Sequence, residues 1–376
     1  MSEQKKSSAS GLTEELLQKL FKFRHERPGD VFMETLRRDG LIVAPGVYDA
    51  MGGYIAKEIY ERCEAAGFPC TFNAVYEGHW STNAMLLRKP DMGFGSLDFL
   101  SVIGKLTVAA AYPLPVIFDI ETGFGNTSTI TQTAERCHEM GIAVAHLEDQ
   151  ADGGTVARRC GNQGGKWCAE IPDAVAKIRA VLTVFKTLNT SVRLMVRTDA
   201  LTAANGGLEN AIERGKRYMS VDVGGWRPTI LWADAMYSPS DIDRWINEFR
   251  KWDPDIILGI NYSPNRDWTP DVYKQKFGVY PPTYSDLYRN GEGFSVIWHT
   301  ILQARADMES TWNVFAGMAA NGSEALWDLH ERQRNHPVGD PQAMSGVREW
   351  QAWEQAMGGD DAKERYDKSE GYKGEK

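Results

Sequence analysis

Residues Leu114 to Gln150 read LPVIFDIETGFGNTSTITQTAERCHEMGIAVAHLEDQ and contain one complete strand–helix–strand pattern. Two short runs rich in Val, Ile and Phe, from Leu114 and from Ile142, flank a segment from Ile130 to Met140 with apolar residues every three or four positions. Short apolar runs are typical of buried strands, and the three- to four-residue spacing is typical of a helix with one apolar face. The stretch therefore predicts a βαβ unit.

The same alternation continues on both sides of this unit. Helix-like segments separate eight apolar runs, which are LIVAPGV from Leu41, CTFNAVY from Cys70, LPVIFDI from Leu114, IAVAHLED from Ile142, RLMVRTD from Arg193, TILWADA from Thr229, IILGINY from Ile256 and GFSVIW from Gly293. Eight strand–helix repeats over about 260 residues predict an α/β fold, a (β/α)8 TIM-type barrel. A doubly wound open sheet would alternate in the same way, but no Gly-x-Gly-x-x-Gly follows the first run.

The segments outside the repeats predict extra helices at both ends of the chain. We expect an N-terminal helical extension at residues 1–37, a barrel domain at residues 38–300 and a C-terminal helical extension at residues 301–376. Residues 346–357 (GVREWQAWEQAM) are rich in large apolar side chains, as are the helix-like segments before them. Such helices usually pack on a neighbour, so we expect an oligomer in which they can exchange between subunits.

The composition excludes several classes of partner. The 376 residues carry 42 Lys and Arg against 51 Asp and Glu, a formal net charge of -9 that repels nucleic acids and anionic membrane surfaces. No apolar run approaches the roughly 20 residues that cross a bilayer, and the first residues lack the apolar core of a secretory signal. The five cysteines are an odd number, which fits a reducing compartment. We therefore predict a cytoplasmic protein with no nucleic-acid or membrane partner.

Most of the apolar runs end in polar residues, and in a barrel these strand ends meet at one mouth, where active sites lie. Asp119 and Glu121 fall on one face of the third strand, and Glu148 ends the fourth. Three carboxylates at one place favour a hard cation with few protein ligands, Mg²⁺ before Ca²⁺. The alternative is that salt bridges to arginines such as Arg197 satisfy the same carboxylates.

The glycine-rich segment from Asp152 to Lys166 (DGGTVARRCGNQGGK) carries a second chemical signal. Cys160 follows Arg158 and Arg159, and two fixed positive charges beside a thiol predict a lowered thiol pKa in a loop that closes over a substrate. The alternative is an exposed loop with an incidental cysteine.

Three further residues at predicted strand ends fit a substrate that bears carboxylates. Arg197 offers a bidentate cation, and Asn261 and Ser263 offer neutral hydrogen bonds. Among the histidines, His79 and His299 lie near strand ends and are weaker candidates, whereas His146 reads as a core residue.

Five motifs in this order resemble those of the isocitrate lyase and phosphoenolpyruvate mutase superfamily, and most of all its isocitrate lyase and methylisocitrate lyase branch. They are Asp119-x-Glu121-Thr-Gly-Phe-Gly-Asn126, His146-Leu-Glu148-Asp149-Gln150, Arg158-Arg159-Cys160-Gly161, Arg197-Thr198-Asp199-Ala200 and Asn261-Tyr-Ser263-Pro264. The resemblance implies a barrel that depends on Mg²⁺, for which Mn²⁺ can substitute, in a homotetramer with exchanged C-terminal helices. It places Asp119, Glu121 and Glu148 near the metal, with Asp91 contacting it through water.

The resemblance also implies a reaction and its residues. A 2-hydroxy di- or tricarboxylate of the isocitrate or methylisocitrate type would be cleaved at a carbon–carbon bond to a 2-oxo acid, such as glyoxylate or pyruvate, and a dicarboxylate. Cys160 would be the general acid, flanked by the catalytic residues Arg158 and Arg159. The implied substrate-binding residues are Tyr76, Gly78, Trp80, Gly161, Asn162, Arg197, Asn261 and Ser263.

The chain departs from the family pattern at several of these positions. Arg158 and Arg159 stand where the lyases carry two lysines or Lys-Arg, Asn162 replaces a histidine, and Glu121 replaces an aspartate. Residues 76–80 (YEGHW) also differ from the Ser-Gly-Trp of the lyase site. Two alternatives follow, an oxaloacetate-type hydrolase or decarboxylase of the same superfamily and a non-catalytic paralogue that binds a small acid. The phosphonate branch is disfavoured, because its members lack the Arg-Cys-Gly loop.

Overall fold

The computed structural model describes residues 13–151 and 156–368, and it contains a closed barrel. Eight parallel strands pair in chain order and β8 closes onto β1, as the apolar runs predicted. The strands are β1 (Ile42–Val47), β2 (Val75–Glu77), β3 (Val116–Asp119), β4 (Val144–Glu148), β5 (Arg193–Thr198), β6 (Ile230–Ala233), β7 (Ile257–Asn261) and β8 (Val296–His299). The predicted (β/α)8 fold is therefore confirmed.

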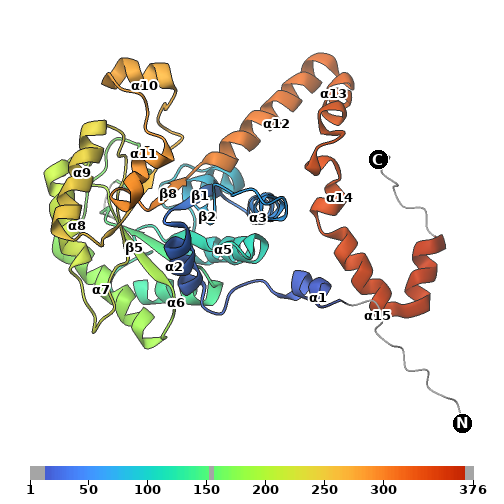
Figure 1. Cartoon of the computed structure of the whole chain (residues 1–376), viewed down its shortest axis with the longest axis horizontal. Helices are drawn as coiled ribbons and strands as arrows, with labels where there is room; N and C mark the ends of the chain where they lie inside the picture. Colours follow the sequence, from blue (N-terminus) through green and yellow to red (C-terminus); the bar gives the residue numbers. More distant parts are fainter. Residues whose placement is uncertain (1–12, 152–155, 369–376) are drawn as a thin grey trace, which may run out of the picture. The chain divides into compact units, whose positions relative to one another are not determined.

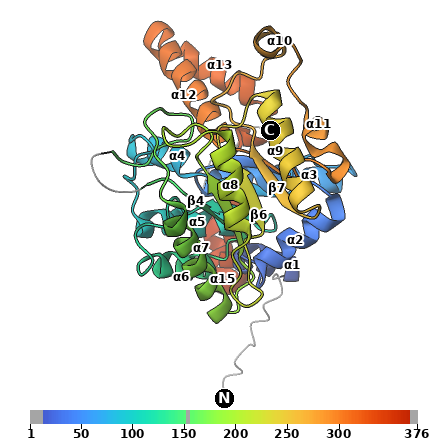
Figure 2. The same ribbon diagram turned by 90° about the vertical axis from the view of Figure 1, so that its left-hand side faces the viewer.

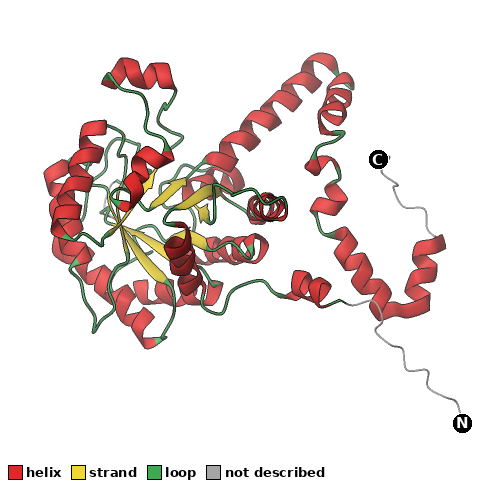
Figure 3. Ribbon diagram, in the orientation of Figure 1, coloured by secondary structure: helices red, strands yellow, loops and turns green. Residues whose placement is uncertain are grey.

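By its internal contacts the chain divides into two units, and the barrel lies in the unit Arg24–Ala306. Figure 3 shows its strands in yellow with the red helices outside them, and Figure 2 shows α7, α8 and α9 over the outer side of the sheet. The helices of this unit are α2 (Pro28–Asp39), α3 (Ala50–Ala65), α4 (His79–Thr82), η1 (Asn83–Leu87), α5 (Leu97–Ala111), α6 (Ile130–Met140), α7 (Ile171–Thr187), α8 (Leu208–Met219), α9 (Pro239–Trp252), α10 (Pro270–Phe277), α11 (Tyr284–Tyr288) and η2 (Arg289–Gly291).

The second unit contains the described residues before Arg24 and after Ala306. Its helices are α1 (Glu14–Phe21), most of α12 (Leu302–Asn321), α13 (Glu324–Gln333), η3 (Pro337–Gly339), α14 (Pro341–Met344) and α15 (Val347–Lys368). Phe21 of α1 packs edge-on against Trp350 and Trp353 of α15, with ring centroids 6.4 and 5.1 Å apart. Helices were thus correctly predicted at both ends of the chain, and their exchange between subunits stays a prediction.

Local signals explain where several helices of the barrel begin and end. The Asp49 side chain accepts a hydrogen bond from Gly52 N at 2.8 Å and caps α3, and Ser96 caps α5 in the same way. Gly40 and Gly141 end α2 and α6 in the left-handed conformation that glycine adopts without steric cost. Figure 1 traces these elements in chain order, from blue at β1 to orange at β8. No helix in the two described ranges is long and apolar enough to span a membrane.

Large aromatic side chains fill the interior of the barrel. Tyr76 stacks on Trp298 with ring centroids 5.7 Å apart, and Trp232 meets Trp298 edge-on at 4.6 Å. Phe32 and Leu36 of α2 belong to the same buried cluster. A second and larger cluster lies between the strands and the outer helices. The barrel is therefore a packed core, and its chemistry is confined to one end.

The contact between α5 and β3 leaves no room for an extra methyl group at Gly104. A Cβ there would lie 2.4 Å from Phe118 Cε2 and 2.9 Å from Met140 Sδ. We expect Gly104→Ala to lower the free energy of unfolding by about 1–3 kcal/mol, because overpacking shifts core side chains. Urea unfolding followed by circular dichroism measures the loss. Gly164→Ala is the control, because a Cβ at Gly164 meets no atom within 4 Å. Equal unfolding midpoints for the two variants would contradict the tight contact.

Candidate active site

The carboxyl ends of the strands bring the predicted polar residues together at one mouth. The barrel register pairs Asp119 with His146 and Glu148 with Arg197 across neighbouring strands. These side chains are all buried. The exposed fraction is at most 9% for each of Asp91, Asp119, Glu121, Glu148, Arg158, Arg197, Asn261 and Ser263. The convergence predicted from the strand ends is therefore present.

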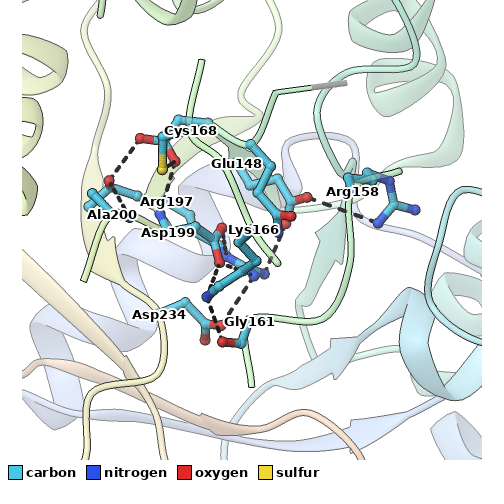
Figure 4. A network of polar contacts seen from close by, with 12 residues as sticks. Glu148, Arg158, Gly161, Lys166, Cys168, Arg197, Asp199, Ala200 and Asp234 are labelled. Carbon is cyan, nitrogen blue, oxygen red and sulfur yellow. Dashed lines mark hydrogen bonds and ion pairs between the residues drawn. The ribbon is translucent and has the colours of Figure 1, made fainter. Parts of the chain in front are cut away.

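The guanidinium of Arg158 lies among the acidic residues. Its Nη1 donates a hydrogen bond to Asp91 Oδ1 at 3.1 Å and lies 4.0 Å from Glu148 Oε1. Its Nη2 contacts Glu121 Oε1. Figure 4 shows Arg158 extending from its loop with a dashed line to Glu148. The charges of these carboxylates raise the pKa of Arg158 even though burial opposes its charge. Arg158 is thus a fixed positive charge inside the acidic cluster.

Arg197 is also committed to carboxylates of the protein. It forms a two-pronged ion pair with Asp199, Nε to Oδ2 at 2.8 Å and Nη2 to Oδ1 at 2.9 Å. Its Nη1 lies 3.1 Å from Glu148 Oε2, and its Nη2 lies 3.1 Å from Asp234 Oδ2. Arg197 and Lys166 together hold the pKa of Asp199 near 2, against the effect of burial. The salt-bridge alternative weighed for Arg197 therefore describes part of this cluster.

Two residues at the end of β2 join the cluster, His79, which the sequence marked as a weaker candidate, and Glu77, which sequence reasoning did not select. His79 Nδ1 lies 3.0 Å from Glu121 Oε1, and its Nε2 lies 3.7 Å from Glu77 Oε2. Burial alone would lower the pKa of His79, but the bond to Glu121 and the nearby acidic charges raise it to about 9. Burial raises the pKa of Glu77 to about 7. The proximity of His79 to a strand end was the signal that pointed to it.

The Cys160 thiol corrects one prediction. Burial, together with the negative charges of Asp91 and Asp234, raises the pKa of this thiol to about 12, where the two preceding arginines had predicted a lower value. The arginine charges are directed elsewhere, because Arg158 pairs with carboxylates and Arg159 donates from Nη1 to the Gly164 carbonyl at 2.9 Å. The thiol is therefore protonated at neutral pH.

Lys166 anchors the cysteine segment to the barrel, and sequence reasoning did not select it. Its Nζ donates to the Gly161 carbonyl at 2.5 Å and to Asp199 Oδ1 at 3.1 Å. Gly161 packs so closely that a Cβ there would lie 1.2 Å from Asp234 Oδ2, so this position admits only glycine. Figure 4 shows Lys166, Gly161 and Asp234 meeting beside Arg197. Residues 152–155 of the predicted loop lie outside the described residues.

The structure places the remaining predicted residues in different surroundings. Asn162 donates from Nδ2 to Ser263 Oγ at 3.3 Å, and Asn261 is buried beside them on β7. Tyr76 lies in the aromatic interior, where its hydroxyl is 3.1 Å from His146 Nδ1. Gly78 precedes the short helix α4, which carries Trp80, and His299 bonds instead to Tyr284 and Tyr262. Contact with a substrate stays a prediction for all of these residues.

The carboxylates at the mouth offer the oxygen donors that a divalent metal ion could use. Asp91, Asp119, Glu121 and Glu148 supply only carboxylate oxygens, the donors that Mg²⁺ prefers. Glu148 Oε1 is buried and accepts no hydrogen bond within the described residues. Among those residues no three His, Cys, Asp or Glu side chains are arranged to hold a metal, and Arg158 pairs with three of the carboxylates. The donor chemistry of these side chains fits Mg²⁺, and in this structure Arg158 occupies them.

The fold and the site together are those of a (β/α)8-barrel enzyme whose buried carboxylates gather at one mouth of the barrel. Residues 32–222 match the phosphoenolpyruvate phosphomutase family. Isocitrate lyase of Haloferax volcanii is 27% identical over 90% of this chain and 89% of its own length. The 2-methylisocitrate lyase of Bacillus subtilis is 27% identical over 80% of this chain and 86% of its own length. The chain belongs to the phosphoenolpyruvate mutase and isocitrate lyase superfamily, a superfamily of carbon–carbon lyases and mutases.

A solved structure supports the fold assignment. Phosphonopyruvate hydrolase in complex with oxalate and Mg²⁺ superposes with a TM-score of 0.65 and 18% identity, over 87% of this chain and 98% of that one. The family match over residues 32–222 confirms, at the level of the superfamily, the resemblance read from the five motifs.

The raised pKa of Cys160 predicts how the thiol reacts. Alkylation requires the thiolate, so the rate at which iodoacetamide modifies Cys160 should keep rising tenfold per pH unit through pH 9. The pKa of about 12 places any plateau above that range. Peptide mass spectrometry at several pH values gives the rate, with half-buried Cys63 as an internal reference. A plateau near pH 7 would show that the arginines do lower the thiol pKa.

Proposed function

We propose that this protein is a divalent-metal-dependent carbon–carbon lyase that cleaves a 2-hydroxy di- or tricarboxylate to a 2-oxo acid and a dicarboxylate. The observation that carries the proposal is a protonated thiol, Cys160, held on an anchored segment beside buried carboxylates suited to Mg²⁺. Family membership and the likeness to an isocitrate lyase over most of both chains support the same reaction.

The metal would be held by Asp91, Asp119, Glu121 and Glu148, with Mn²⁺ as a substitute for Mg²⁺. When bound, it would polarise the substrate's carboxylate and lower the pKa of its hydroxyl group. The neutral side chains of Asn162, Asn261 and Ser263 would receive the substrate's carboxylates. Asn261 Oδ1 and Asn162 Oδ1 are buried and accept no hydrogen bond within the described residues, so each can accept from a substrate hydroxyl group, whereas a substrate carboxylate would take the amide Nδ2 and the Ser263 hydroxyl donors.

Cys160 would supply the proton that completes the cleavage. The substrate hydroxyl would give up its proton to water as its oxygen forms the new carbonyl double bond. The bond between the hydroxyl-bearing carbon and its neighbour then breaks, and the electron pair passes to the neighbouring carbon, next to a carboxylate. This carbon takes a proton from Cys160 Sγ, and the thiolate is reprotonated before the next turnover. A thiol with a pKa of about 12 is fully loaded with its proton at neutral pH, as this role requires.

The assembly and compartment are part of the proposal. We propose a cytoplasmic homotetramer without nucleic-acid or membrane partners, in which helices of the C-terminal region pack between subunits. Trp312 and Phe315 of α12 are 74% and 66% exposed in the single chain, and Trp327 of α13 is 62% exposed. Burial of such side chains against another subunit removes apolar surface from water.

The substrate is tested by offering isocitrate, 2-methylisocitrate, 2,3-dimethylmalate and oxaloacetate separately to the pure protein with Mg²⁺. We expect glyoxylate or pyruvate from one of the first three, detected by mass spectrometry and abolished by EDTA. Oxalate and acetate, or carbon dioxide above the Mg²⁺-only control, from oxaloacetate would instead establish the hydrolase or decarboxylase. If no product forms from any of the four substrates, the non-catalytic paralogue would be favoured.

The role of Cys160 is tested by Cys160→Ser with the substrate found in that assay. We expect kcat to fall by about 10²-fold or more, because the serine hydroxyl is a far weaker acid than the thiol. Metal affinity should not change, since Cys160 is not among the proposed ligands. Cys63→Ser on α3 is the matched control and should keep the wild-type kcat. Full activity of Cys160→Ser would remove the thiol from the reaction.

A further inference from the structure

We propose that the guanidinium of Arg158 and a divalent metal ion compete for the same carboxylates, so that Arg158 must leave the acidic cluster before the metal binds. The inference rests on the metal site of the proposed function and adds that Arg158 occupies this site when no metal is bound. Arg158 is 4% exposed, and its two terminal nitrogens face Asp91, Glu121 and Glu148.

The first step of the argument is electrostatic. An arginine does not lose its proton at neutral pH, so the charge among these carboxylates is permanent. A divalent ion bound to the same oxygen atoms would lie within a few ångströms of that charge in a buried site, where water screens repulsion poorly. The two cations therefore exclude each other, although the carboxylates accept either one.

The second step concerns the oxygen atoms that a metal would use. Glu121 Oε1 contacts Arg158 Nη2, and Asp91 Oδ1 accepts from Arg158 Nη1. Glu148 Oε1, 4.0 Å from Nη1, accepts no hydrogen bond within the described residues. Arg158 thus uses two of these carboxylates directly and leaves Oε1 of Glu148 without a donor, while Glu148 Oε2 pairs with Arg197. A metal ion would satisfy the free Oε1 better.

The third step shows that Arg158 can leave without loss of the cysteine segment. Gln150 holds the backbone at Arg159, accepting from Arg159 N at 2.9 Å and donating to Arg159 O at 2.6 Å. Lys166 holds the Gly161 carbonyl from the other side. Both anchors are independent of the Arg158 side chain, so the cysteine segment keeps them when that side chain turns away from the carboxylates.

A direct binding measurement tests the competition. Mn²⁺ is titrated into the full-length protein and free Mn²⁺ is read by electron paramagnetic resonance, without substrate or turnover. We expect Arg158→Gln to bind Mn²⁺ at least about tenfold more tightly than the wild type, a change equivalent to about 1.4 kcal/mol. Arg159→Gln removes the same charge one residue away, where the side chain faces the Gly164 carbonyl, and should match the wild type.

The outcomes separate this inference from the proposed function. Equal affinity in the wild type and Arg158→Gln would overturn the competition and leave the metal site intact. Binding by Arg158→Gln alone would support the competition and remove the metal from the native reaction. No binding by either protein would overturn both.

A second measurement uses the wild-type chain, in case Arg158→Gln fails to fold with its carboxylates unpaired. Phenylglyoxal modifies accessible arginines, and peptide mass spectrometry reports each site. We expect modification of the buried Arg158 to rise several-fold at saturating Mn²⁺, while modification of Arg159 stays constant. If Arg158 is equally protected with and without Mn²⁺, it does not leave the cluster and the inference is wrong.

Discussion

Buried negative charge at the barrel mouth is the constraint on which the site depends. The strand ends place Asp119, Glu148 and Asp199 where water hardly reaches, and a buried carboxylate without a cation or donor is costly. Three cations balance this charge. Arg197 pairs with Glu148, Lys166 with Asp199 and Arg158 with Glu121. Arg197 pairs with carboxylates of more than one element, whereas Lys166 and Arg158 tie the cysteine segment to carboxylates of the barrel. The charge network therefore also fixes the local structure.

The cysteine segment shows how that network orders a loop. The polar anchors of the segment are Gln150 at Arg159, Lys166 at Gly161 and the carboxylates around Arg158. Gly161 is pressed against Asp234, which keeps Cys160 in a buried place where burial and the nearby acidic charges raise the pKa of its thiol. The charges that hold the loop therefore add to the effect of burial on that thiol.

The sequence was sufficient for the fold because burial periodicity is a local property. The run from Leu114 became β3, the segment from Ile130 became α6, and polar residues after each strand met at one mouth as expected. The direction of the pKa shift of Cys160 was mispredicted, since adjacency along the chain does not say which way Arg158 and Arg159 point. Lys166 was missed for a related reason, because its partner Asp199 is distant in sequence and meets it only in the folded barrel. Glu77 was missed because its complete burial is a property of the folded barrel.

The departures from the lyase pattern are easier to understand as one change than as separate losses. Glu121 is one methylene longer than the usual aspartate, Arg158 is longer than lysine, and His79 comes from the altered β2 exit. Arg158 Nη2 and His79 Nδ1 both contact Glu121 Oε1. Residues that share a partner couple energetically, so the effect of each substitution depends on the others. Here the longer acid and the two altered side chains meet at one atom, so the three departures form one group of matched charges in the buried site.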